Sequence, residues 1–423
     1  MKIVLILLSL YFSLFALTLK EAEQKARNEN KDILIQKSIK DTQQSTLEAI
    51  KAKNYGSIDL SSSYTKYDSA RTLKPLSPPI SSDIATSTDI TNIAVSYNVV
   101  LFNGFNDTKE ISISKIQNEM QNTFLTLTLN QILYNVRAIY LDILALKKQK
   151  EAKEEYKEAL NILKENITRE VSLGKRARVE ELKVDASLQD IITQINSLES
   201  NINILKSSLA VLINQEEDFE LIDISESRKG KIENKILEKS SYFQKIQNLS
   251  TYKISEFNYQ KASSEYQKSK SSYYPKITAN TQYTKVYSND GDDDKIWQAG
   301  LALSWNIFDF GKTSALVQKA KIAQNQASLE LQKRKLELKQ TITEAINRIK
   351  QNNDAYKGAK KEFLFTSESE KIEKIRYEQE AIDIYTYLYA KSSNAIVKSK
   401  KIIAKYNLLK SYYYFDYILE ESK

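Results

Sequence analysis

Charged residues occur in two short segments of this 423-residue chain, Thr168–Gly174 and Arg376–Asp383, where they could act together. Each segment lies between two long helical patterns, so we expect both to be helix-to-helix turns. Carboxylates that are brought together at a narrow place attract cations. Charges in exposed turns, however, often do no more than keep the turn solvated. The residues alone leave both interpretations open.

The residue types exclude several kinds of chemistry. The chain contains no Cys and no His, which rules out disulfides, thiol or imidazole metal sites, and nucleophilic triads built on histidine. No mixed α/β pattern that would form a catalytic pocket is visible. The net charge of +8 comes with lysines spread along helices, which form a solvated face more often than a nucleic-acid stripe. We therefore expect no enzyme, no cofactor, no metal and no nucleic-acid partner.

Two short motifs have ordinary explanations. Asp290–Asp294 could attract Ca²⁺, but a solvated turn is preferred because the segment lacks the twelve-residue calcium loop and its final glutamate. Asp309–Gly311 spells the magnesium motif of protein kinases, without the other kinase motifs. It directly follows a strand pattern. We expect Gly311 to bend the chain from strand into helix, with Asp309 near the helix N-terminus.

Long helices must position these segments, because the chain has only 8 Gly and 4 Pro. The patterns predict helices at 18–53, 106–167, 175–214, 232–272, 312–377 and 382–420. Two seams have the alternating three- and four-residue steps of coiled coils. The seams are Leu125, Leu129, Ile132, Val136, Ile139, Ile143 and Leu146, and then Val184, Leu188, Ile191, Ile195, Leu198, Ile202, Leu205, Leu209 and Leu212.

Four other segments alternate apolar and polar residues, which predicts strands at 55–67, 92–102, 276–287 and 296–308. Their lengths match the strands of transmembrane barrels, about 9–11 residues. Aromatic residues that could form the interfacial girdles are Tyr64, Tyr97, Tyr283, Tyr287, Trp297 and Trp305. The fold class is therefore mainly α with β, with long coiled-coil helices and four membrane strands per chain.

The two halves of the chain match each other. Ser96–Val99 aligns with Ser304–Ile307 at an offset of 208, and Tyr64 aligns with Tyr283 at an offset of 219. The difference falls in the Pro/Ser-rich stretch Leu73–Ser87, where a loop tolerates insertion. We expect a first structural repeat at residues 17–230 and a second at 231–423, each with the order helix-strand-strand-helix-helix.

The first 16 residues are predicted to be a secretory signal peptide. Lys2 precedes an apolar run from Ile3 to Phe15, and Ala16 ends it, with cleavage expected near Leu17. The run is short for a membrane-spanning helix, which needs about 20 apolar residues, although an uncleaved anchor stays open as an alternative. The chain is thus directed out of the cytoplasm.

Four strands are too few to close a barrel, since the smallest bacterial barrels use about eight. In lipid an unpaired backbone group costs several kcal/mol. If these strands enter a membrane, several chains must therefore share one barrel, and the flanking helices must continue it as a hollow bundle. An outer membrane is the destination consistent with the signal peptide.

Several motifs together resemble those of the TolC-like outer membrane efflux family. Leu17–Ala22 looks like the start of the mature family chain, and Leu173-Gly174 resembles its helix-turn-helix motif, although Glu380 stands where the second motif often has glycine. The two strand-to-helix junctions of the family are matched by Phe102, Gly104, Phe308 and Gly311. The order of these motifs within a duplicated frame is more specific than any one of them.

This resemblance implies a homotrimer with a 12-stranded barrel in the outer membrane, contacting outer-membrane lipid, and a 12-helix tunnel in the periplasm. The chain would be the passive, gated exit duct of a tripartite efflux or type I secretion system, with a periplasmic adaptor and an inner-membrane RND or ABC pump as partners. The family closes its tunnel at the two turns and meets the adaptor there. The implied gate residues are Arg169, Glu170, Arg376, Tyr377, Glu378, Glu380 and Asp383, and the implied adaptor-docking turn is Leu173 and Gly174.

A periplasmic coiled-coil adaptor or a secreted structural rod is the main alternative. Such a protein would explain the heptads and the signal peptide, but not the four alternating strands with their aromatic edges. A rod should wash off membranes, whereas a barrel should need detergent. The sequence does not identify the exported cargo.

Overall fold

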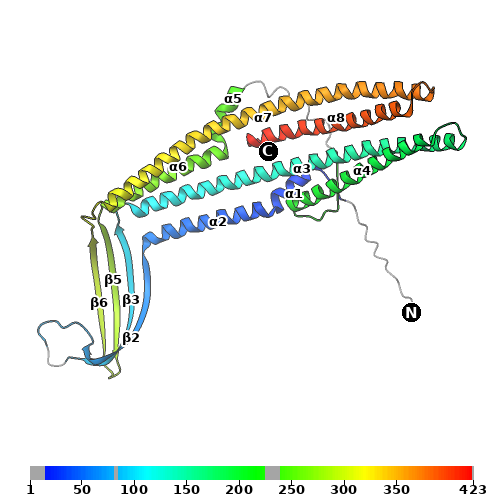
Figure 1. Cartoon of the computed structure of the whole chain (residues 1–423). Coiled ribbons are helices and arrows are strands. Elements are labelled where there is room, and N and C mark those ends of the chain that lie inside the picture. The colour runs from blue at the N-terminus through cyan, green and yellow to red at the C-terminus, as the bar shows by residue number, and fades with distance from the viewer. Residues whose placement is uncertain (1–14, 81–83, 224–238, 422–423) are drawn as a thin grey trace, which may run out of the picture. The chain divides into compact units, whose positions relative to one another are not determined.

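The computed structural model describes residues 15–80, 84–223 and 239–421 (Figure 1). The chain forms two compact units. Among the described residues, the helical unit comprises 15–37, 125–223, 239–250 and 335–421, and the sheet unit comprises 38–80, 84–124 and 251–334. Each unit takes segments from both predicted repeats. The repeats at 17–230 and 231–423 remain a proposal about how the chain arose.

The sheet unit contains one four-stranded antiparallel sheet with the order β2-β3-β5-β6. Its strands are β2 (Ser57–Thr72), β3 (Thr86–Phe102), β5 (Lys276–Ser288) and β6 (Asp293–Ser304). The first two strands are longer than predicted, because their ladder continues past a register shift between Lys66 and Arg71. The last strand ends earlier than predicted, since its partner β5 begins only at Lys276, directly after Pro275.

One face of this sheet is apolar and exposed. Its residues include Ile58 and Leu60 on β2, Val95 on β3, and Trp297 and Leu301 on β6, the last two 77% and 75% exposed. The opposite face carries small and polar residues such as Ser61, Ser63, Asn98, Asn280 and Gln298. Soluble monomers rarely expose an apolar surface of this kind, so the face is suited to lipid or to another protein.

Helices flank each strand pair within the sheet unit. They are parts of α2 (Lys31–Ala52), α3 (Asn106–Ser172) and α7 (Lys312–Glu378), together with α6 (Ser250–Ser269). Short 3₁₀ turns, η1 (Lys53–Tyr55) and η5 (Lys270–Tyr273), lead from helix to strand. Within the described ranges, no helix combines the length and apolar character that crossing a bilayer requires.

The helical unit contains two antiparallel helix pairs. The first joins α3 to α4 (Arg178–Ile213), and the second joins α7 to α8 (Ile384–Ile418). The predicted seam on α4 is confirmed, because Val184, Leu188, Ile191, Ile195, Ile202 and Leu209 are buried. Smaller elements of this unit are α1 (Leu19–Glu29), α5 (Lys239–Gln244), η4 (Lys245–Asn248), β1 (Phe15–Leu17) and β4 (Phe219–Leu221).

The predicted helix 18–53 is interrupted at Asn30. The Asn30 side-chain oxygen accepts hydrogen bonds from the backbone of Asp32 and Ile33, at 3.0 and 3.2 Å, and so starts a new helix. Its amide nitrogen donates to the carbonyl of Leu212 at 2.9 Å. The predicted helix 232–272 is also broken at Leu249, and its first residues, 232–238, lie outside the described residues.

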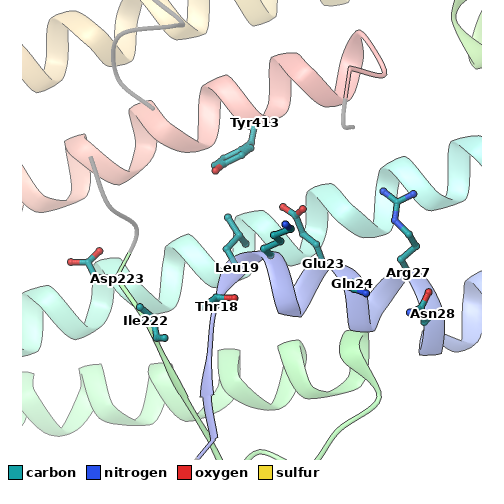
Figure 2. A pocket seen from close by; sticks show the side chains of 10 residues that line it. Thr18, Leu19, Glu23, Gln24, Arg27, Asn28, Ile222, Asp223 and Tyr413 are labelled. Atoms are coloured by element: carbon teal, nitrogen blue, oxygen red, sulfur yellow. The ribbon is translucent and has the colours of Figure 1, made fainter. Parts of the chain in front are cut away.

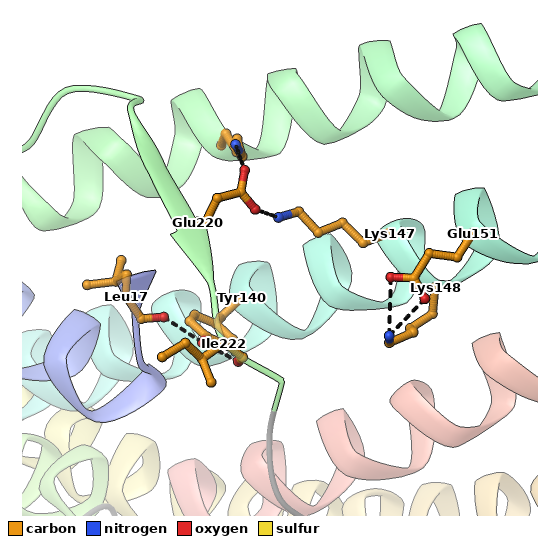
Figure 3. Close-up of polar contacts among 8 residues, drawn as sticks. Leu17, Tyr140, Lys147, Lys148, Glu151, Glu220 and Ile222 are labelled. Atoms are coloured by element: carbon orange, nitrogen blue, oxygen red, sulfur yellow. Dashed lines mark hydrogen bonds and ion pairs between the residues drawn. The ribbon is translucent and has the colours of Figure 1, made fainter. Parts of the chain in front are cut away.

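The predicted signal peptide lies mostly outside the described residues, which begin at Phe15. Phe15–Leu17 forms β1, which pairs in parallel with β4. Tyr140 of α3 ties the two strands together, because its hydroxyl donates to the carbonyls of Leu17 and Ile222, at 2.8 and 2.6 Å (Figure 3). Burial raises the pKa of Tyr140 to about 12, which keeps the donor protonated.

Candidate functional site

The first turn of the helical unit reverses the chain between α3 and α4. The Gly174 amide donates to the carbonyl of Val171 at 2.9 Å, and the Lys175 amide donates to that of Glu170 at 2.8 Å. Gly174 has a φ of 71°, and a Cβ there would meet nothing within 4 Å. The turn therefore needs glycine for its backbone conformation and not for space.

The second turn repeats this frame 206 residues later, between α7 and α8. The Glu380 amide donates to the carbonyl of Tyr377 at 2.9 Å, and the Ala381 amide donates to that of Arg376 at 2.9 Å. Glu380, with a φ of 56°, occupies the position of Gly174. Asp383 then caps α8, because its carboxylate accepts from the Thr386 amide at 2.8 Å.

Arg176, just after the first turn, connects the two helix pairs. Its guanidinium donates to the carboxylates of Glu170 and Glu180, the latter at 2.9 Å. Its central carbon lies 4.7 Å from the centre of the Tyr377 ring. The ring of Tyr377 in turn stacks on Tyr387 of α8, with centroids 5.2 Å apart. The cation–π contact thus joins the two turns, and the ring stack holds Tyr377 in place within the second helix pair.

Tyr377 is buried, with 6% of its surface exposed. Its hydroxyl has no hydrogen-bond partner within the described chain. Burial raises the pKa of Tyr377 to about 12, so the hydroxyl stays protonated and remains a donor. A buried, unsatisfied hydroxyl costs roughly 1–3 kcal/mol.

A groove of about 420 Å³ opens beside this contact. Five of the seven predicted gate residues line it: Arg169, Glu170, Tyr377, Glu378 and Glu380. The other two make local contacts, Arg376 with Glu373 at 3.1 Å and Asp383 with Thr386. Leu173, predicted to dock an adaptor, is 63% exposed at the end of the first turn.

Sequence reasoning missed Arg176, Glu180 and Tyr387. The four-residue spacing of Arg176, just before α4, and Glu180, in its first turn, is a local signal that could have suggested their ion pair. The contact with Tyr377 crosses from one helix pair to the other, and no local pattern indicates it. A second such contact places the Lys183 ammonium 3.7 Å from the centre of the Tyr385 ring.

The predicted strand-to-helix junctions lie in the sheet unit. Gly104 has a φ of 64°, and a Cβ there would lie 2.6 Å from the carbonyl oxygen of Ser271. Gly311 has a φ of 88° and open space around it. Phe102 packs edge-on against Phe105, and Phe308 packs edge-on against Phe310. The two junctions therefore share a bend, but only the first is sterically tight.

Several other charged groups of the described chain form ion pairs. A cavity of about 550 Å³ lies beside α1 (Figure 2), where the Glu23 carboxylate is bonded to the Arg137 guanidinium at 2.6 Å. In the predicted acidic turn, Asp293 and Asp294 pair with Lys285 and Lys74. The described residues contain no group of three or more carboxylates placed to hold a metal ion.

Residues 250–412 match the family model of the outer membrane efflux proteins. No curated protein matches the chain. The fold, however, matches solved structures over 95% of the chain. The CmeC outer membrane channel of Campylobacter jejuni is 14% identical, with a TM-score of 0.78 and 85% of its own length covered.

Two further solved structures agree. The outer membrane protein VceC of Vibrio cholerae is 12% identical with a TM-score of 0.74, and the match covers 95% of each chain. The open MtrE outer membrane channel of Neisseria gonorrhoeae is 12% identical with a TM-score of 0.77, over 95% of this chain and 88% of that one. At this identity the likeness establishes the fold, while the match to the outer membrane efflux proteins covers residues 250–412.

Proposed function

We propose that this chain is the passive, gated exit duct of an export assembly in the outer membrane. The family match over residues 250–412 carries this proposal. The sheet unit supports it, because one face of its sheet is apolar and exposed. The strands would lie in the membrane, and the helical unit would line a tunnel in the periplasm.

The duct would be a homotrimer. Within the described chain, β2 and β6 each pair on one side only. In lipid those open edges must find partners, and three copies of a four-stranded sheet would close a 12-stranded barrel. The rod hypothesis gives the exposed apolar face no role, which is why the duct is favoured over it.

The gate would lie at the two turns of the helical unit. Arg176 holds the first turn to Tyr377 of the second, so the two helix pairs cannot separate without breaking this contact. Glu378 and Glu380 line the adjoining groove, and Asp383 lies at the start of α8. Repeated three-fold, these carboxylates would form a ring that attracts cations.

The exposed Leu173-Gly174 turn would meet a periplasmic adaptor, and an inner-membrane pump of the RND or ABC class would supply the energy. Leu173 offers an apolar side chain on a turn that glycine fixes, a rigid feature that a partner could grip. Transport through efflux or type I secretion would then depend on the pump.

Single-channel conductance in planar bilayers tests the gate. In Arg176→Ala the cation–π contact and both ion pairs are lost, so the closed-state conductance should rise several-fold. Arg178→Ala is the matched control, because Arg178 is an exposed residue two positions later, at the start of α4. Equal conductance in the two variants would argue against the Arg176 contact as part of the gate.

Neutralising the three carboxylates tests the cation ring separately. In the combined Glu378→Gln, Glu380→Gln and Asp383→Asn variant, block by multivalent cations should weaken. The Asn at 383 keeps the helix cap. Failure of the wild-type protein to form any channel in the bilayer would instead contradict the duct itself.

A further inference from the structure

The open edges of the sheet carry information about how two copies would meet. β6 pairs with β5 only, and β2 pairs with β3 only, among the described strands. Trp297, Leu301 and Leu303 on β6, and Ile58, Leu60 and Tyr64 on β2, are all exposed and lie on the same sheet face. A β6–β2 contact between copies would extend this apolar face without a break, provided that the register keeps the two faces in phase.

Internal duplication fixes which residues of the two repeats are equivalent. The strands β2 and β5 begin at Ser57 and Lys276, an offset of 219. The helices α3 and α7, which follow β3 and β6, begin at Asn106 and Lys312, an offset of 206. The caps agree with this second offset: Asn103 and Asp309 each accept a hydrogen bond from the backbone amide four residues later.

The strand pairs observed in the two repeats are related by the same two offsets. In the first repeat Ile58 pairs with Tyr97. The residue 219 positions after Ile58 is Ile277, and the residue 206 positions after Tyr97 is Leu303. These two residues pair with each other in the second repeat. The 208-residue alignment of Ser96–Val99 with Ser304–Ile307 therefore differs from the strand pairing by two residues.

The junction between the two repeats is the β3–β5 ladder, in which Val95 pairs with Tyr283. If three copies close a ring, the β6–β2 junction between copies is the equivalent of this ladder. The residue equivalent to Val95 is Leu301, 206 positions later in the chain. The residue equivalent to Tyr283 is Tyr64, 219 positions earlier. We propose that Leu301 of one copy lies directly opposite Tyr64 of the next copy, in an antiparallel β6–β2 ladder; this inference rests on the proposed trimeric duct.

This register pairs Ser61–Lys66 of β2 with Ala299–Ser304 of β6, up to the point where the β2 ladder shifts its register between Lys66 and Arg71. The first residues of β2, Ser57–Leu60, then face 305–308. Trp305 and Ile307 are exposed in the single chain, and pairing with the next copy would extend β6 over residues 305–308.

Disulfide cross-linking tests the register, and the chain has no Cys to confuse the result. Directly opposed residues of an antiparallel ladder have Cα atoms about 4.5–5.5 Å apart, within the range of a disulfide. The full-length double variant Leu301→Cys with Tyr64→Cys should therefore oxidise to a covalently closed trimer on a non-reducing gel. Conductance of each variant under reducing conditions checks that it still folds.

Matched variants pair Leu301→Cys with Ser62→Cys or with Lys66→Cys. These positions are on the same face but two residues away, about 7 Å along the strand, and should cross-link poorly. If position 301 cross-links most strongly to position 62 or 66, the proposed register is wrong, but a barrel shared between copies is still supported. No cross-link at any of the three positions would overturn the register together with the trimeric barrel.

Discussion

The two turns of the helical unit share a backbone frame but fix it with different residues. At the first turn, Gly174 adopts the left-handed conformation at no steric cost, and Ala177 at the N-cap of α4 provides no side-chain cap. At the second turn, Glu380 adopts that conformation with a side chain, and Asp383 caps α8. Each turn thus has one of the two local stabilising features that a helix reversal uses.

The comparison separates local from long-range stabilisation. Val171 and Tyr377 occupy equivalent positions, yet only Tyr377 carries a ring that contacts both Arg176 and Tyr387. The second turn therefore depends more on contacts with the other helix pair. We expect substitutions there to affect both turns, whereas substitutions at Gly174 should act locally.

The largest effect is expected from Tyr377→Ala. Removing a buried aromatic ring should cost about 3 kcal/mol of local stability, against about 1 kcal/mol for Val171→Ala at the equivalent, half-buried position. Hydrogen exchange of the turn amides in the detergent-solubilised protein measures both. In Tyr377→Ala the amides of both turns should lose their protection against exchange. In Val171→Ala only the amides of the first turn should lose it.

The Tyr377→Phe variant separates the contribution of the Tyr377 ring from that of its hydroxyl. The Tyr377 hydroxyl has no partner within the described chain, so its removal should leave stability unchanged or raise it by about 1 kcal/mol. A clear loss of stability would contradict this prediction, because it would show that the hydroxyl is hydrogen-bonded in solution.

The next effect in size concerns glycine. Gly174→Ala should destabilise the first turn by about 1 kcal/mol, because alanine disfavours a φ of 71°. Gly358→Ala is the matched control. Gly358 lies within α7 with open space around it, so alanine should stabilise that helix by about 1 kcal/mol. Thermal unfolding of the two variants should shift in opposite directions, and shifts of the same sign would contradict a conformational role for Gly174.

Glu380→Gly makes the second turn resemble the first. Relief of the left-handed strain should outweigh the entropy lost by glycine and stabilise the turn by about 0.5 kcal/mol. Hydrogen exchange at the Ala381 amide, which donates to Arg376, reports the change. Faster exchange in this variant would show that the Glu380 side chain makes a contact worth more than the strain.

The sequence predicts the parts of this structure whose signals are local. The α4 seam and the four strands follow from periodicity, and the turns follow from the places where the helical periodicity stops. Asn30 starts a new helix through local bonds to Asp32 and Ile33, but its amide also donates to Leu212, 182 residues away, and no nearby part of the sequence indicates that contact. β1 and β4 are three residues each, too short for any periodicity. Arg176 was missed for the same reason as Asn30, because its decisive neighbour Tyr377 belongs to another helix pair.

The smallest expected effect is the acid sensitivity of the second turn. Hydrogen bonds from the Thr386 amide and hydroxyl lower the pKa of Asp383 from its ordinary value of 3.8. A lowered folded-state pKa means that the cap stabilises α8 fully above pH 3.8 and loses this contribution as the pH falls below that value. The first turn has alanine at the equivalent position and serves as an internal reference.

Between pH 5 and pH 3, hydrogen-exchange protection should therefore fall at Thr386 but not at Glu180, the residues three positions after Asp383 and Ala177. Because Asp383 is exposed, solvent screening keeps the effect modest. In Asp383→Asn the amide still caps the helix but does not titrate, so protection at Thr386 should persist to pH 3. If the Asn variant loses protection as the wild type does, another group near the second turn titrates in this range and the cap is not the cause.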